Sequence, residues 1–359
     1  MPDLRGKCSA VYAYEVGRSA DLRRCREIFR DTATRLPEVR KRPAPSLFGL
    51  SEHPTVWLAS PAMATLCGAE TEIVRRAAIY DFGCISVSLE LSLAGDAAAW
   101  RDMAIDLSVQ SALGKLARAT LDEAIGHISE AIVDFEVSRR FAPYFIYQLD
   151  RVPTGDAGQW LAANELFVAQ ILRGESSALA EHQVKDTIQK RISYAPDDLV
   201  VIDYAASLIV DSESADTVAV LEFANIELLS LQVLDEQLDD ALATANRLIH
   251  SRTHGARNLV RPFGKPIRKL VELTVDAAAE FEAVDNAIKL TDDHYLGRVY
   301  RLAADRFHLT GFDTDITRKL QTLWNIHTIY IERAATRRSE LLEWIIILLI
   351  ALEIFTVVR

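Results

Sequence analysis

The strongest constraint on this chain is its last apolar segment, which reads LLEWIIILLIALEIFTVV from Leu341 to Val358. As a helix, these 18 residues would extend about 27 Å, at the short end of the range for membrane-spanning helices. Thirteen of them are Leu, Ile, Val or Phe, and their transfer into lipid is worth about −4 to −8 kcal/mol in total. We therefore predict a C-terminal transmembrane helix over residues 341–358.

The polar residues of this segment fit a membrane helix. Glu353 would cost about 2.5–3.5 kcal/mol at the bilayer centre, but near one end it can reach the headgroup layer or take up a proton. Trp344 suits the interfacial belt at the other end. The soluble alternative is a core helix, which needs protein partners on all sides. The predicted membrane-anchor residues are Trp344, Ile345, Ile346, Leu348, Leu349, Leu352, Glu353 and Phe355.

Composition and charge describe a folded body that stays in the cytoplasm. Half of the 359 residues are hydrophobic, a quarter are charged, and the net charge of −11 disfavours nucleic-acid binding by the chain as a whole. The four cysteines lack metal-site spacing, which is typical of reduced thiols, and the N-terminus resembles no signal or transit peptide. Arg333, Arg337 and Arg338 precede the apolar segment, so the positive-inside tendency also favours a cytoplasmic body, most simply a bacterial one.

Residues 1–212 show alternating strand and helix patterns, which predict an α+β domain. Short β-branched or aromatic runs predict strands at 8–16, 53–60, 76–91 and 195–211, and one or two more within 130–152. Helical patterns cover 19–30, 94–107, 158–174 and 178–193. Ser19 or Asp21 is the expected N-cap of the first helix.

Residues 213–340 form a predicted helical region with apolar positions alternating by four and three. One such seam consists of Ala224, Leu228, Leu231, Asp235, Leu238, Leu242, Ala245 and Ile249. A second begins after Gly311, in a helix predicted from Asp313 to Glu340, and consists of Ile316, Leu320, Leu323, His327, Tyr330, Ala334, Arg337, Leu341 and Trp344. The pattern fits an antiparallel bundle within one chain or a coiled coil between chains, in which the polar seam positions would fix register.

A basic stretch interrupts the helical region between Arg247 and Lys269, where seven basic residues occur without an acidic one. It is interpreted either as a solvated connection between helices or as an anion-binding tip for lipid headgroups or RNA. The candidate anion-binding residues are Arg252, Arg257, Arg261, Lys265, Arg268 and Lys269.

Short motifs of known enzymes do not carry over. Asp81-Phe82-Gly83 lacks the other kinase motifs and predicts a turn between strands. Phe263–Pro266 lacks the P-loop pattern, Gly174–Ser176 is no nucleophile elbow, and His250 with His254 has no clear third metal ligand. We predict no catalytic residues, no metal, no cofactor and no small-molecule substrate.

Several segments resemble one known family. The final RRSELLEWIIILLIALEI, the helix that begins AVLEFANIELLSLQVLDEQLD and the stretch TDDHYLGRVYRL resemble the family named "required for meiotic nuclear division". RAAIYDFGCISVSLEL is similar to a strand pair of that family. The resemblance implies a membrane-anchored, non-enzymatic protein that assembles with itself. Mitochondrial members of the family are linked with the translation machinery, and no catalytic residue carries over.

The sequence therefore predicts a membrane-anchored scaffold or tether, which is oligomeric through its helical region. An alternative is a membrane-tethered module that holds RNA or a ribosome through the basic stretch. A third, weaker interpretation is an enzyme whose site lies in the first domain. Copurifying nucleic acid would favour the second, and an enclosed pocket of acids or histidines with shifted pKa values would favour the third.

Overall fold

The structure, a computed structural model, describes residues 3–32, 53–109, 111–251, 275 and 294–357. The chain divides into two compact units. Unit 1 comprises Met1–Val233 and Glu282–Gly311, and unit 2 comprises Leu234–Phe281 and Phe312–Arg359. Each unit is described separately below.

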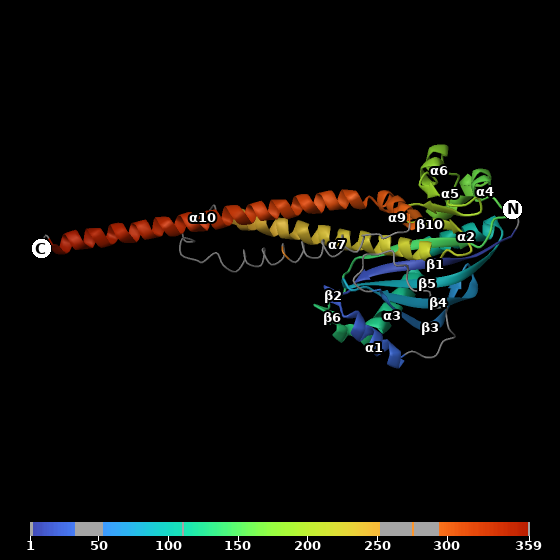
Figure 1. The fold of residues 1–359 in the computed structure, drawn as a ribbon, viewed down its shortest axis with the longest axis horizontal. Coiled ribbons are helices and arrows are strands. Elements are labelled where there is room, and N and C mark those ends of the chain that lie inside the picture. The colour runs from blue at the N-terminus through green and yellow to red at the C-terminus, as the bar shows by residue number, and fades with distance from the viewer. Residues whose placement is uncertain (1–2, 33–52, 110, 252–274, 276–293, 358–359) are drawn as a thin grey trace. The chain divides into compact units, whose positions relative to one another are not determined.

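Unit 1 is built on an eight-stranded mixed sheet, which confirms the α+β class (Figure 1). Its strands lie in the order β3-β4-β5-β1-β7-β10-β9-β8, and every neighbouring pair is antiparallel except β7 and β10. The strands are β1 (Leu4–Glu15), β3 (Thr55–Leu66), β4 (Ala69–Ile79), β5 (Cys84–Gly95), β7 (Phe141–Leu149), β8 (Arg191–Ile192), β9 (Leu199–Ile202) and β10 (Ala206–Val210). Short strands β2 (Ser19–Ala20) and β6 (Ile132–Val133) form a separate ribbon.

The predicted turn at Asp81-Phe82-Gly83 is confirmed, because it separates β4 from β5. Gly83 has a φ of 78°, and a Cβ at this position would lie 1.9 Å from the carbonyl oxygen of Gly17. The turn also contacts the segment after β1, since the Val16 amide donates to the Gly83 carbonyl at 2.9 Å. Glycine is therefore required here both by backbone conformation and by space.

One face of the sheet packs against the helices of the first two hundred residues, and the main hydrophobic core lies between them. These helices are α1 (Leu22–Thr32), α2 (Ala97–Val109), α3 (Ser111–Ile128), α4 (Ala157–Ala163), α5 (Glu165–Arg173) and α6 (Glu181–Thr187), with a 3-10 turn at Ser129–Ala131. Asp21 caps α1 by accepting hydrogen bonds from the amides of Arg23 and Arg24 at 3.0 and 3.1 Å, which confirms one of the two predicted caps. Helix α3 is a structural element that the sequence patterns did not predict.

The opposite face is covered by helix α7 (Ala215–Ser251) and is unusually polar for a buried surface. On the strands, Ser9, Ser86 and Ser88 are fully buried. From Leu221 to Glu227 every side chain of α7 is buried, so this part of the helix has no single apolar stripe. The predicted seam residues Ala224 and Leu231 are buried, but they do not stand out from their neighbours here, because the helix is enclosed on all sides.

Two buried polar residues of helix α7 have hydrogen-bond partners on the sheet and on helix α9 (His294–Arg306). The side-chain amide of Asn225 donates to the Ala142 carbonyl at 2.9 Å, and the Tyr300 hydroxyl donates to Glu227 at 2.6 Å. Among the side chains that the structure describes, one helix, Ala215–Arg247, is apolar and long enough to cross a membrane. Because 78% of its apolar window is buried inside the protein, it fits a core helix equally well.

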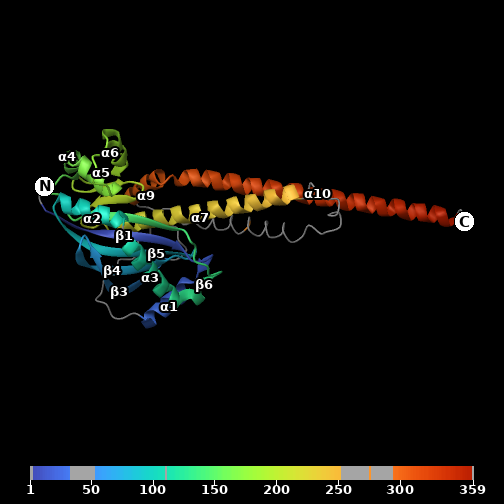
Figure 2. The same cartoon turned by 180° about the vertical axis from the view of Figure 1, so that it is seen from behind.

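In unit 2, the later part of α7 lies beside α10 (Leu309–Val357), and the two run in the same direction (Figures 1 and 2). Ile316 and Leu323 of α10 are buried, as are Leu238 and Ala245 of α7. The predicted seams therefore meet within one chain in this unit, and the residues expected to supply an antiparallel helix between them lie almost entirely outside the described residues. Helix α10 also begins at Leu309, four residues before the predicted start, and continues through the apolar segment.

The acidic position in the predicted α7 seam has a specific partner in unit 2. The ammonium group of Lys319 lies 2.7 Å from a carboxylate oxygen of Asp235 and 2.5 Å from one of Asp239. Lys319 is only 14% exposed, so its charge is largely removed from water and needs these carboxylates. The interruption is thus an ion pair between α7 and α10. A coiled coil between chains and a membrane-spanning tail stay predictions.

Candidate functional site

The predicted membrane-anchor residues lie on α10. Trp344 is 69% exposed, and Ile345, Ile346 and Leu349 are each more than half exposed. The neighbouring Ile347 and Ile350 are exposed to a similar extent. The side chains of Leu348, Leu352, Glu353 and Phe355 lie outside the described residues. The described part of the segment therefore presents a continuous apolar surface.

The candidate anion-binding residues all lie outside the described residues, namely Arg252, Arg257, Arg261, Lys265, Arg268 and Lys269. So do His254 and Phe263–Pro266. Arg247, the first basic residue of the stretch, is exposed, and it bonds within its own helix to the Ala243 carbonyl and the Thr244 hydroxyl. The anion-binding site therefore stays a prediction.

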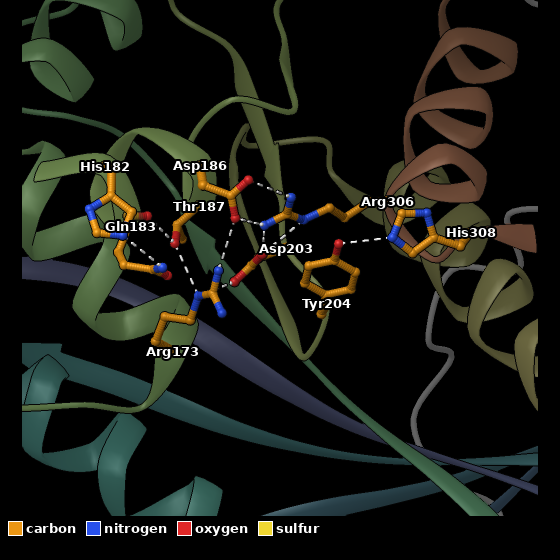
Figure 3. Close-up of polar contacts among 9 residues, drawn as sticks. All are labelled: Arg173, His182, Gln183, Asp186, Thr187, Asp203, Tyr204, Arg306 and His308. Carbon is orange, nitrogen blue, oxygen red and sulfur yellow. Dashed lines mark hydrogen bonds and ion pairs between the residues drawn. The ribbon is translucent and has the colours of Figure 1, made fainter. Parts of the chain in front are cut away.

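Sequence reasoning missed the most concentrated group of charges in unit 1, an ion-pair cluster of Arg173, Asp186, Asp203 and Arg306 (Figure 3). Four separate elements supply its members. Arg173 is the last residue of α5, Asp186 lies in the last turn of α6, and Arg306 is the last residue of α9. Asp203 follows strand β9 in the tight turn before β10, where its amide donates to the Ala206 carbonyl at 2.9 Å.

Asp203 is the centre of the cluster, and its side chain is only 1% exposed. Arg306 donates from Nε to Oδ1 of Asp203 at 2.9 Å, and its Nη2 bonds the same oxygen. The other carboxylate oxygen lies 2.8 Å from Nε of Arg173. The buried carboxylate therefore faces two guanidinium groups, which compensates for the hydration that it lost on folding.

Asp186 lies on the side of the cluster that is exposed to solvent. Its carboxylate accepts from Nη1 and Nη2 of Arg306 at 3.4 and 3.0 Å and from Nη2 of Arg173 at 3.2 Å. The hydrogen bonds from Arg306 hold the pKa of Asp186 below its ordinary value of 3.8. Burial lowers the pKa of Arg306, but its hydrogen bonds to Asp186 and Asp203 outweigh that effect and the net change is upward. Both shifts favour the charged forms of Asp186 and Arg306.

An aromatic pair extends the cluster to the corner between α9 and α10. The guanidinium carbon of Arg306 lies 4.1 Å from the ring centroid of Tyr204, a cation–π contact. The Tyr204 hydroxyl lies 2.9 Å from Nε2 of His308 (Figure 3). His308 has a φ of 58°, the left-handed conformation that ends helices, and the Gly311 amide donates to its carbonyl at 2.9 Å. The cluster therefore positions this corner.

The cluster is arranged to hold structural elements together. Two carboxylates and two guanidinium groups balance each other, and guanidinium does not lose its proton at any pH that a folded protein experiences. Neither carboxylate is arranged as a general acid or base. Within the described ranges, no three His, Cys, Asp or Glu side chains gather as ligands for a metal ion.

A second buried ion pair joins α7 to the sheet. Nη2 of Arg76 on β4 lies 2.6 Å from a carboxylate oxygen of Glu222, which is 3% exposed. The charge of Glu222 raises the pKa of Arg76 and keeps the guanidinium ionised. Close by, Phe223 packs against Tyr80 with ring centroids 6.2 Å apart. This pair fixes α7 on the sheet, as the first cluster fixes α9.

With this geometry described, the chain can be compared with known proteins. Residues 5–217 match the family described as uncharacterised protein MJ0711, N-terminal domain. The match extends from β1 to the first turn of α7 and covers more than half of the chain. The chain belongs to this family. The matched residues of this chain include Arg173, Asp186 and Asp203, whereas Arg306 lies beyond them.

A search of curated proteins gives the same relationship. The uncharacterised protein MJ0711 of Methanocaldococcus jannaschii is 21% identical over 244 residues, which are 67% of this chain and 72% of the relative. This relative is archaeal, whereas the sequence suggested a bacterial source. No solved structure matches. The resemblance to the "required for meiotic nuclear division" family is not addressed by these matches and stays a prediction.

Proposed function

We propose that this member of the MJ0711 N-terminal domain family is a membrane-anchored, non-enzymatic scaffold. Its apolar segment at 341–358 would cross the bilayer, unit 1 would lie in the cytoplasm, and its helical region would bring copies together. The resemblance to the "required for meiotic nuclear division" family favours the same function. The observation that carries the proposal is the exposed apolar surface of α10 from Trp344 to Ile350.

This surface would be unfavourable in water. Six large apolar side chains are each more than half exposed along less than two turns of helix. Complete burial of one such side chain is worth about 1.5–3 kcal/mol, so covering all six gains several kcal/mol even after their partial burial is discounted. A cover of lipid satisfies every side of the helix at once, whereas a partner helix covers one stripe.

The length and composition of the segment agree with a lipid cover. Its 18 residues would extend about 27 Å, close to the thickness of the hydrocarbon core, and Trp344 would lie at an interface. Helix α7 is the other strongly apolar helix, and its apolar window is mostly buried against protein. The burial of α7 is therefore explained by the fold, and the exposure of α10 is not.

The described body supports a scaffold rather than a catalyst. Its buried charges are paired, as in the ion-pair cluster and in Arg76–Glu222, and both sets connect elements that are distant in sequence. Such pairs hold helices in place. A rigid body of this kind is suited to presenting a surface to partners.

The test compares Leu349→Asp with Ile329→Asp in the full chain. Both residues are about half exposed on α10, but only Leu349 belongs to the apolar segment. An aspartate near the bilayer centre replaces a favourable residue at a cost of about 3–4 kcal/mol. We expect the unaltered protein and Ile329→Asp to stay in the membrane pellet after alkaline carbonate extraction, and Leu349→Asp to shift to the supernatant. An unaltered protein found in the supernatant of detergent-free lysates contradicts the proposal.

The basic stretch Arg247–Lys269 favours one alternative, a membrane-tethered RNA- or ribosome-binding module. Seven basic residues without an acidic one form a local reversal of sign in a chain of net charge −11. Charge reversal of Arg257, Arg261 and Lys265 would then release copurifying RNA, and binding would weaken steeply with salt. Membrane association that survives this change, with no RNA bound before it, supports the scaffold.

A further inference from the structure

The two edges of the eight-stranded sheet differ in how they are protected. At one edge, β8 has two residues and begins with Arg191. At the other edge, β3 has twelve residues, reads TVWLASPAMATL and carries no charge. Proteins normally blunt an exposed edge with short strands, charges, proline or a bulge, because unpaired backbone groups bind other strands. Among the described residues, the edge at β3 is thus the one without these protections along its first half.

The two faces of β3 are also unequal. On the face toward the main core, Trp57 is 7% exposed and stacks on Phe29 with ring centroids 5.8 Å apart. On the other face, Val56 is 48% and Leu58 is 36% exposed. Val74 of the neighbouring strand β4 lies on the same face and is 48% exposed. The first half of β3 is therefore held firmly from one side and presents an apolar surface on the other.

Protection by irregular geometry begins only halfway along the strand. The pairing of β3 with β4 shifts between Ala59 and Ala62, which is a bulge. Pro61 lies in this bulge and has no amide hydrogen, and the Ser60 carbonyl accepts from Nε of Arg75 at 2.7 Å. Thr55–Ala59 remains a regular, uncharged segment of edge strand.

We propose that Thr55–Ala59 pairs antiparallel with the same segment of a second copy of this chain, so that two sheets join across a two-fold axis. An antiparallel strand is its own complement, and such a pairing requires no other partner. The backbone groups of both edges would be satisfied, and Val56 and Leu58 of the two copies would meet on one face. The strand offers no charge by which an acidic or basic partner would be recognised.

The size of this contact sets its strength. Stable interfaces bury about 1,200–2,000 Å² in total, and two five-residue strands bury less than that. The pairing is therefore weak in dilute solution and becomes populated where copies are concentrated, as they would be on a shared membrane. The pairing itself does not depend on the membrane proposal, since high protein concentration has the same effect.

Disulfide cross-linking tests the geometry in the full chain. The background is Cys67→Ser, because Cys67 is the exposed cysteine, whereas Cys8, Cys25 and Cys84 are buried. In it, Val56→Cys, Leu58→Cys and the double variant with both changes cover the registers centred on residues 56–58. The matched control is Val74→Cys, equally exposed on the same face but one strand further in. In a paired dimer its counterpart would be about 14 Å away, beyond the reach of a disulfide.

We expect oxidation to give a covalent dimer from at least one of the three β3 variants, and only background from Val74→Cys. Cross-linking should persist in concentrated detergent solution even if the protein leaves the membrane, so that failure of the anchor and failure of this pairing are distinguishable. Leu58→Lys, which places like charges at the contact, should abolish the dimer formed by Val56→Cys. No dimer from any β3 variant, or equal dimer from Val74→Cys, overturns the proposal.

Discussion

Arg306 donates from Nε to Oδ1 of Asp203 at 2.9 Å, although 103 positions of sequence separate the two residues. Asp203 ends a strand inside the matched family domain, and Arg306 ends a helix outside it. The contact therefore attaches α9 to the sheet by a buried charge.

Replacing Arg306 with methionine should destabilise unit 1 strongly. The change leaves Asp203 buried with one guanidinium instead of two, and loss of one partner of a buried ion pair typically costs about 3–5 kcal/mol. Because Asp186 is partly open to water, we expect a value near the lower limit. Urea unfolding followed by circular dichroism measures it. Arg301→Met, which removes an exposed arginine of the same helix, is the control and should change stability by less than about 0.5 kcal/mol.

The Arg76–Glu222 pair should behave as a coupled unit. Either Arg76→Met or Glu222→Gln alone leaves a buried charge without its partner and should cost about 3 kcal/mol or more. The double variant Arg76→Met with Glu222→Gln should be more stable than the sum of the single changes predicts. A double-mutant cycle built from thermal or urea unfolding reports this coupling, and simple additivity would show that the pair acts independently.

Unit 1 should lose stability in acid through Asp186 and Asp305. Hydrogen bonds from Arg306 lower the pKa of Asp186, and those from Lys190 lower the pKa of Asp305, both from an ordinary value of 3.8. Since these pKa values are lower in the folded state, the stabilisation is present above the ordinary value and disappears as the pH falls through the folded one. The free energy of unfolding should therefore decline below about pH 4. Asp186→Asn should flatten that decline, whereas Asp197→Asn, at an exposed position, should leave it unchanged.

Two turns of the sheet offer a matched pair of glycines, Gly83 between β4 and β5 and Gly68 between β3 and β4. Gly83 and Gly68 have φ angles of 78° and 77°, so alanine pays about the same backbone cost of 1–2 kcal/mol at both positions. A Cβ at Gly83 would also lie 1.9 Å from the Gly17 carbonyl oxygen, whereas nothing lies within 4 Å at Gly68. Gly83→Ala should consequently lower the urea midpoint clearly more than Gly68→Ala does. Equal losses would mean that the chain at Gly17 moves aside freely.

Local patterns predicted the strands well, because side chains that alternate between two faces leave a period of two in the sequence. Strand β1 and the turn at Asp81-Phe82-Gly83 are examples. Helix α3 was missed although Leu113, Ala117, Leu121, Ala124 and Ile128 are buried at helical spacing, because two glycines and several polar residues lie between them. The burial of polar residues on α7 was not predicted either, because it depends on partners on the sheet that bind Glu222 and Asn225 in the core.

The ion-pair cluster could not be read from the sequence. Arg173 and Asp186 are 13 positions apart, and Arg306 is 120 positions from Asp186, so no spacing rule brings them together. Their charges look like ordinary surface residues until the fold buries them. A weak signal was present in Asp203, a carboxylate that directly follows the apolar strand LVVI. The sequence therefore predicted the elements, but the long-range charge pairing that joins them depends on the assembled sheet.

The place of β1 in the middle of the sheet has a consequence for biosynthesis. Its two neighbours are β5 and β7, which are both synthesised later, so β1 cannot complete its hydrogen bonding until Leu149 has been made. At about 5–20 residues per second, the delay after Glu15 emerges is roughly 7–27 s. During that interval the largely apolar run CSAVYAY of β1 stays unpaired on the nascent chain, where it would be a natural client for a ribosome-associated chaperone.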